Sequence, residues 1–160
     1  MDILIQLTYL GEAAYAMLLG GIIGFEREYS DKPAGLRTLM LVSGSAAVLM
    51  IAGENVIKTD AYTEINELIN IDPIRIIQSI IIGISFLGAG TIILREEKER
   101  LEGLTTAAAI LLAGTIGICT GLHLYFLAAG ISLMGLTVIS GLRFFDRWIN
   151  NIRERKQNKG

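Results

Sequence analysis

The stretch GLTTAAAILLAGTIGICTGL, residues 103–122, runs through 20 positions without a charged side chain. A helix needs about 20 predominantly apolar residues to cross a hydrocarbon core about 30 Å thick. Only a helix can cross as a single segment, because it bonds its backbone N–H and C=O groups internally. The stretch therefore predicts a transmembrane helix over residues 104–122.

Small residues recur at every fourth position of this helix and would form one narrow face. They are Thr105, Ala109, Ala113, Gly117 and Gly121. Lipid gives helices no hydrophobic reason to associate, so close backbone approach along such a face must supply the contact. Glycines of two other apolar stretches extend this packing prediction, namely Gly20, Gly24, Gly83, Gly88 and Gly90.

Four more apolar stretches occupy residues 3–25, 38–57, 76–94 and 124–142. Together the five predict an all-α integral membrane protein with five transmembrane helices, in a domain of residues 1–142 followed by a basic cytoplasmic tail, 143–160. Glu54, near the end of the second stretch, makes that one the weakest of the five. The composition agrees, with 52% hydrophobic residues, a mean hydropathy of +0.53 and 19% charged residues, against about 25% in soluble domains.

The basic residues predict which way the chain crosses the membrane. With five spans, twelve of the 14 Lys and Arg residues fall on the side that holds the C-terminus. Cytoplasmic loops carry an excess of Lys and Arg. We therefore expect the N-terminus outside and the C-terminus in the cytoplasm.

Several function classes are excluded by residue type. The chain has one Cys and one His, which excludes an internal disulfide, a cysteine zinc site and a pair of His ligands. A net charge of −2 gives no basic surface for nucleic acid. No phosphate-binding loop or hydrolase motif occurs, since the glycines at 88 and 90 lie inside an apolar span. We expect a non-enzymatic protein without a cofactor, with bound Mg²⁺ as the alternative.

Two hairpins of the sequence align at an offset of 68 residues. Between residues 19–38 and 87–106, seven of twenty positions are identical, including Arg27 with Arg95 and Thr38 with Thr106. This predicts a parallel repeat of two hairpins, with the fifth helix added. The alternative is that two cytoplasmic turns share one favourable turn sequence.

Ionisable residues at membrane depth are the first candidates for function. Glu12 lies about a third of the way into the first span and is either functional or merely tolerated there. Asp72 precedes a helix start, and Arg75 and Gln78 follow on one face, suiting an interhelical hydrogen-bond network or a polar cavity lining. The candidates for a metal ligand are Glu12, Glu26 and Asp72, since Mg²⁺ prefers carboxylate and water oxygens.

Three motifs, taken together and in order, resemble the MgtC/SapB family. They are GGIIGFERE with KPAGLRT (residues 20–38), DPIRIIQ with GISFLGAG (72–90) and GLTTAA (103–108). Ser85 and Glu102 depart from the usual residues, and many members continue into a cytoplasmic domain where this chain has only its short tail. The polar positions carried over from the motifs are Glu26, Arg27, Glu28, Arg37, Thr38, Asp72, Arg75, Gln78, Thr105 and Thr106.

The resemblance implies a bacterial inner-membrane protein linked to growth at low magnesium and, in pathogens, to intracellular survival. We expect it to modulate a partner membrane protein through its small-residue faces and through Glu26, Arg27 and Arg37. The alternative is a small Mg²⁺ or cation transporter or channel subunit. The expected partners are the lipid bilayer, a second membrane protein or a further copy of the chain, and no nucleic acid.

Overall fold

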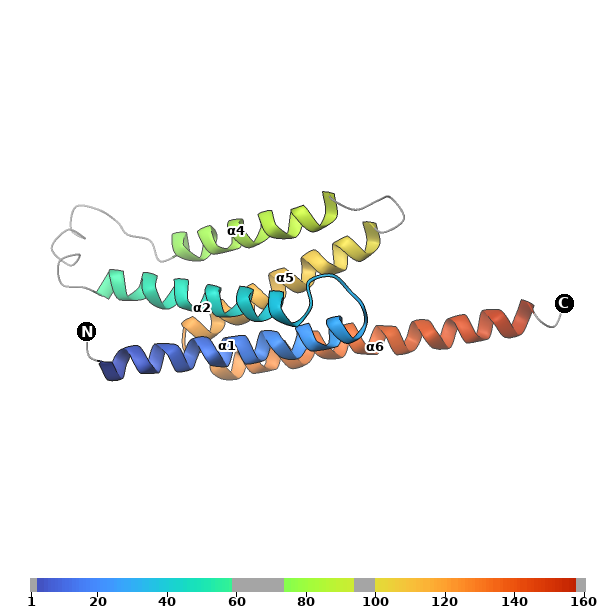
Figure 1. Ribbon diagram of the computed structural model, residues 1–160, viewed down its shortest axis with the longest axis horizontal. Helices are drawn as coiled ribbons and strands as arrows, with labels where there is room; N and C mark the ends of the chain where they lie inside the picture. Colours follow the sequence, from blue (N-terminus) through green and yellow to red (C-terminus); the bar gives the residue numbers. More distant parts are fainter. Residues whose placement is uncertain (1–2, 59–73, 94–99, 158–160) are drawn as a thin grey trace.

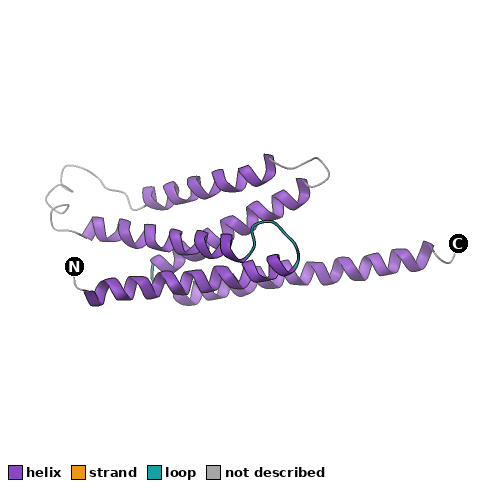
Figure 2. Cartoon of the chain, in the orientation of Figure 1, coloured by secondary structure: helices purple, strands orange, loops and turns teal. Residues whose placement is uncertain are grey.

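The computed structural model describes residues 3–58, 74–93 and 100–157. Over these residues the chain forms five helices, shown in Figure 1: α1 (Ile3–Tyr29), α2 (Leu36–Lys58), α4 (Ile74–Ile93), α5 (Arg100–Gly121) and α6 (Tyr125–Gln157). No strand occurs in the same residues (Figure 2). The predicted all-α class is confirmed.

Four of the helices are long and apolar enough to cross a membrane, namely α1, α2, α4 and the Gly103–Gly121 part of α5. The fifth helix, α6, is apolar over Tyr125–Gly141 among the residues whose side chains are described, which reaches the lower limit of about 17 residues for a span. The second stretch, expected to be the weakest, lies in a helix segment of 22 residues, Leu36–Ile57, that is apolar enough to span. The chain is a multi-pass membrane protein.

Helix α6 is one continuous helix to Gln157 and extends well beyond the rest of the bundle (Figure 1). It passes without a break through position 142, where the sequence predicted the membrane domain to end. The boundary between the apolar and basic parts therefore lies within a helix, not in a linker.

Helix α5 is the centre of the bundle, because it contacts all four other helices. Its small residues Ala109, Ala113, Gly117 and Gly121 are buried, whereas Thr105, in the same row, is exposed. A Cβ on Gly117 would collide with the backbone oxygen of Ser43 in α2. The α2–α5 contact is thus a close backbone approach of the kind that small residues permit.

The two hairpins α1–α2 and α4–α5 pack through corresponding positions. A Cβ on Gly20 would lie 2.6 Å from the backbone oxygen of Leu39, and one on Gly88 would lie 3.3 Å from the Cβ of Ala107. These two pairs are related by the same 68-residue offset. Helices α1 and α4 also run in the same direction (Figure 1), as expected for two parallel hairpins.

The remaining small residues of the two outer helices have different surroundings. A Cβ on Gly24 would lie 2.7 Å from the Cα of Leu36, so α1 and α2 approach closely where they meet their turn. A Cβ on Gly83 or Gly90 would meet nothing within 4 Å. Within the described residues, α4 therefore uses Gly88 for packing and leaves its other two glycines open.

Candidate functional site

The end of the bundle that holds the α1–α2 turn contains the Arg27 cluster, made of Glu26, Arg27, Glu28 and Thr106. Arg27, in the last turn of α1, is only 1% exposed. Its Nη2 donates hydrogen bonds of 2.7 Å to the backbone oxygen of Pro33 and to Thr106 Oγ1, and its Nε donates to the same oxygen of Pro33 at 3.2 Å. One buried guanidinium thus joins the end of α1, the turn and the start of α5.

Local residue choices give the turn the shape that Arg27 holds. Asp31 and Ala34 adopt positive φ angles of 52° and 54°. Glu28 Oε2 accepts a 2.8 Å hydrogen bond from the backbone N–H of Leu36, and so caps the positive N-terminus of α2. Gly35 permits this cap, since a Cβ there would lie 2.8 Å from the same oxygen.

The other motif residues at this end differ in exposure. Glu26 is partly buried, and its Oε1 accepts a 3.2 Å hydrogen bond from Ser30 Oγ. Arg37 is exposed in the first turn of α2, and Thr38 is partly buried beside it. Of the two adjacent threonines in the GLTTAA motif, Thr106 is buried and Thr105 is exposed.

The ten motif positions do not form a single site. Arg75 and Gln78 are exposed in the first turns of α4. The start of α4 lies at the opposite end of the bundle from the end of α1, whose last turn contains Arg27 (Figure 1). Asp72 lies outside the described residues, so its predicted network with them is not seen. The structure brings Arg27 and Thr106 together across 79 positions of sequence.

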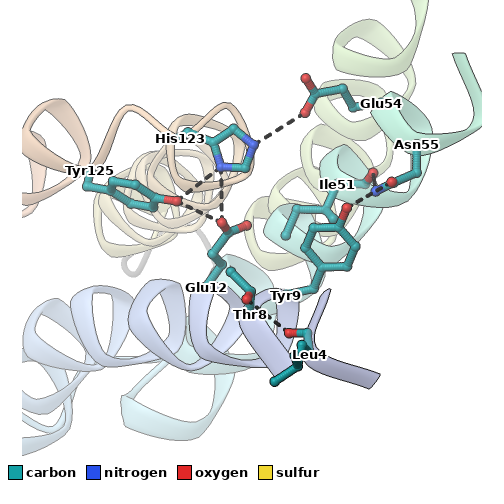
Figure 3. Close-up of polar contacts among 9 residues, drawn as sticks. All are labelled: Leu4, Thr8, Tyr9, Glu12, Ile51, Glu54, Asn55, His123 and Tyr125. Carbon is teal, nitrogen blue, oxygen red and sulfur yellow. Dashed lines mark hydrogen bonds and ion pairs between the residues drawn. The ribbon is translucent and has the colours of Figure 1, made fainter. Parts of the chain in front are cut away.

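The end of the bundle where α1 begins holds the Glu12–His123 cluster, made of Glu12, Glu54, His123 and Tyr125 (Figure 3). Tyr125 Oη donates a 2.7 Å hydrogen bond to Glu12 Oε1, and His123 Nδ1 lies 3.0 Å from that oxygen. His123 Nε2 faces Glu54 Oε2 at 3.6 Å. The cluster therefore joins α1, α2 and the α5–α6 turn.

A second hydrogen-bonded pair stands beside this cluster. Tyr9 of α1 donates a 2.8 Å hydrogen bond to Asn55 Oδ1 of α2, and Asn55 Nδ2 donates to the backbone oxygen of Ile51 (Figure 3). Tyr15 meets Tyr125 edge to face, with ring centroids 5.9 Å apart. This end of the bundle thus holds several side chains that can both donate and accept hydrogen bonds.

Sequence reasoning singled out only Glu12 from this cluster. Glu54 counted as a weakness of its span, and His123 served only to exclude other sites. The available signal was topology, because the end of the fourth predicted span, where His123 lies, and the first third of the first span, where Glu12 lies, fall on the same side of the membrane. Nothing in residue spacing showed that the two would face each other.

The two candidate metal ligands that the structure describes, Glu12 and Glu26, do not converge. Glu12 and Glu26 both lie on α1, about 21 Å apart at about 1.5 Å per residue, and Asp72 is outside the described residues. Among the residues that the structure describes, no three His, Cys, Asp or Glu side chains are grouped so that they could hold a metal ion.

An apolar core separates the two clusters. It is built from side chains of α1, α2 and α5, including Leu19, Ile23, Leu39, Ile110 and Ile116. Three buried hydroxyl groups in this part of the bundle donate hydrogen bonds to backbone oxygens: Ser43 to Leu39, Thr120 to Ile116 and Ser132 to Leu19. In the described part of the chain, therefore, no row of buried acids leads from one cluster to the other.

Comparison with known proteins places these features in a family. The sequence model of the MgtC family matches residues 14–148. Protein SapB of Bacillus subtilis is 38% identical over 78% of this chain and 49% of its own length. An Escherichia coli K12 protein named "Putative magnesium transporter YhiD" is 35% identical over 78% of this chain and 55% of its own.

One further relative matches nearly the whole of this chain. An uncharacterised Haemophilus influenzae protein is 36% identical over 96% of this chain and 63% of its own length. The chain thus spans about half to two thirds of these relatives. No solved structure matches. The family match covers the Arg27 cluster and nearly the whole helical bundle, and the chain belongs to the MgtC family.

Proposed function

We propose that this chain is a non-enzymatic protein of the bacterial inner membrane that acts in adaptation to low magnesium by modulating a partner membrane protein. Membership of the MgtC family supports a role in magnesium homeostasis, as does the name of the Escherichia coli relative. The distribution of Lys and Arg supports an outside N-terminus and a cytoplasmic Arg27 cluster.

The apolar core between the two polar clusters is the observation that favours modulation over transport. A hydrated divalent cation keeps several waters and binds through carboxylates, so a carrier needs polar groups along its path. In the described residues, the segment of α1 between Glu12 and Glu26 buries apolar side chains and glycines. This arrangement supports a protein that acts through its surface.

The surface expected to act on a partner is the exposed rim of the Arg27 cluster. Arg27 is too deeply buried to touch a partner, and its part is to hold the α1–α2 turn in shape. Arg37 and Glu28 are exposed on that rim and can form ion pairs with another protein. A loss of function in an Arg27 variant would therefore reflect a misshapen turn, whereas one in an Arg37 variant would reflect a lost contact.

Magnesium flux into proteoliposomes tests the proposal against the transporter alternative. The purified chain is reconstituted with a fluorescent magnesium indicator inside, beside Asp72→Asn and Glu26→Gln variants and empty liposomes. Modulation predicts flux equal to that of empty liposomes from protein that is folded and monodisperse. Flux that the wild type supports and either variant abolishes would overturn the proposal and assign the carboxylates to a transport path.

A second experiment tests the rim directly. The chain is expressed in cells that depend on it for growth at low magnesium, and cross-linked partners are identified beside Arg37→Ala and Arg27→Lys variants. We expect Arg37→Ala to lose both the growth and a cross-linked membrane protein while keeping wild-type thermal stability. Full growth in Arg37→Ala, or a cross-link only to a second copy of the chain, would contradict modulation of a different protein through this rim.

A further inference from the structure

The imidazole of His123 lies between two carboxylates that belong to different helices. Its Nδ1 faces Glu12 of α1 at 3.0 Å, and its Nε2 faces Glu54 of α2 at 3.6 Å (Figure 3). A neutral imidazole carries a hydrogen on one nitrogen only, whereas the imidazolium carries one on each. When both carboxylates are ionised, the two contacts are therefore attractive at once only if His123 is protonated.

The backbone of the α5–α6 turn fixes where this imidazole stands. His123 has a positive φ of 61°, and its N–H donates a 2.9 Å hydrogen bond to the backbone oxygen of Thr120. Leu124 N–H likewise donates to the backbone oxygen of Cys119 at 2.9 Å. The ring is thus placed by a closed turn at the end of α5.

The burial of the Glu12 carboxylate favours a positive charge close to it. Its side chain is only 8% exposed, and its Oε2 is buried without a hydrogen-bond donor among the described residues. A buried carboxylate with an unused oxygen is costly unless positive charge lies close by. A protonated His123 would supply that charge at Oε1, and Tyr125 donates its hydroxyl hydrogen to the same oxygen.

The proton on His123 can exchange with solvent. The His123 side chain is 45% exposed and that of Glu54 is 29% exposed, in contrast to Glu12. Among the described residues, the titratable groups that face His123 from the packed elements are Glu12 on α1, Glu54 on α2 and Tyr125 on α6. A histidine side chain changes its charge between about pH 5 and about pH 8.

We propose that Glu12, Glu54 and His123 form a proton-binding link that joins α1 and α2 to the α5–α6 turn at acidic pH and loosens as the pH rises. When His123 loses its proton, one of its two nitrogens turns a lone pair toward a carboxylate, and that contact becomes repulsive. The helix ends then separate locally while the Arg27 cluster is unaffected. On the predicted orientation this link faces the outside of the cell, and it operates independently of any role in magnesium homeostasis.

Distances between spin labels test the link in the full chain. Labels are placed at Val56 near the end of α2 and at Phe126 at the start of α6, both exposed, in a background with Cys119→Ala. The protein is studied in nanodiscs at about pH 5 and about pH 8, across the titration range of histidine. We expect a narrow distance distribution at the lower pH and a several-fold smaller short-distance population at the higher pH.

Two variants of His123 separate the proton from the turn. His123→Asn removes the charge but suits the positive φ angle, so it should give the broad distribution at both pH values. His123→Arg keeps a permanent charge and should give the narrow distribution at both. A wild type without a pH response, or a pH response that survives in His123→Asn, would overturn the proposal.

Discussion

The two polar clusters lie at opposite ends of one bundle and are built from different chemistry. The Arg27 cluster centres on a guanidinium that is 1% exposed and charged at every physiological pH. The Glu12–His123 cluster centres on an imidazole that is 45% exposed and lies between two carboxylates, and histidine is the side-chain type whose charge can change in the physiological pH range. The first can therefore fix a shape under all conditions, whereas the second can make its end of the bundle respond to the solvent.

The largest effect should come from the contact that lies between the two ends. Gly117→Leu would drive a side chain into the backbone of α2 at Ser43, and backbone cannot move aside cheaply. We expect a loss of about 3 kcal/mol or more in the free energy of unfolding, at the upper limit for overpacking. Denaturation in mixed micelles measures this loss. Because the contact lies between the two ends, we expect the structure of both polar clusters to be disturbed.

Gly83→Leu is the matched control, because a Cβ at Gly83 would meet nothing within 4 Å. It introduces the same side chain in another apolar span and should leave the free energy of unfolding within about 0.5 kcal/mol of the wild type, as surface changes do. Equal stabilities for the two leucine variants would show that the α2–α5 contact does not hold the ends in place.

The next largest effect should be confined to one end. Arg27→Leu removes the hydrogen bonds to the partly buried backbone oxygen of Pro33 and to the buried hydroxyl of Thr106. Hydrogen bonds to a charged group contribute about 1.5–3 kcal/mol each, so we expect a loss of about 3 kcal/mol. Arg37→Ala, at an exposed position of the same end, should change the stability by less than about 0.5 kcal/mol.

Hydrogen–deuterium exchange of the Arg27→Leu variant sharpens the comparison. Uptake should rise in the α1–α2 turn and at the start of α5, and should stay at the wild-type level around His123. A rise of similar size at both ends would mean that the apolar core transmits the disturbance, and the two clusters would then be one unit.

The fold was predictable because a membrane reduces it to a few rules. Apolar length alone located the helices, and the first predicted span, residues 3–25, lies within the observed α1, Ile3–Tyr29. The four-residue spacing of small residues indicated which face of α5 is buried. The apolar part of α6, Tyr125–Gly141, lies within the predicted fifth stretch, residues 124–142. The continuation of the helix to Gln157 was not predicted, since hydropathy locates the lipid boundary but not the end of a helix.

The sites were predictable only where their contacts are local. The cap from Glu28 to Leu36 and the bond from Arg27 to Pro33 span eight residues or fewer, and both lie within one quoted motif. The bond from Tyr125 to Glu12 spans 113 positions. Such a contact depends on how α6 is rotated against α1, and periodicity along either helix leaves that rotation open.

A smaller effect is expected at the other end of the bundle. Tyr125→Phe removes the 2.7 Å hydrogen bond to Glu12 but keeps the aromatic ring against Tyr15. We expect a loss of about 1 kcal/mol in the free energy of unfolding. Tyr15→Phe, which loses a longer bond of 3.3 Å to a backbone oxygen, should cost less. The reverse order would mean that Glu12 does not depend on the Tyr125 hydroxyl.

The smallest effect tests whether the Arg27 end is as insensitive to solvent as its buried arginine suggests. Glu28 is exposed, and its carboxylate caps the N-terminus of α2 at Leu36, where a negative charge contributes about 0.3–1 kcal/mol that salt screens. Glu28→Gln keeps the acceptor oxygen and removes the charge, so its loss of stability should be in that range at low salt and should shrink as salt is added. Arg27→Leu should be insensitive to salt, because its lost contacts are buried. A Glu28→Gln effect that persists at high salt would mean that the carboxylate interacts with buried groups of the turn. The Arg27 cluster would then contain both a part that responds to solvent and a part that does not.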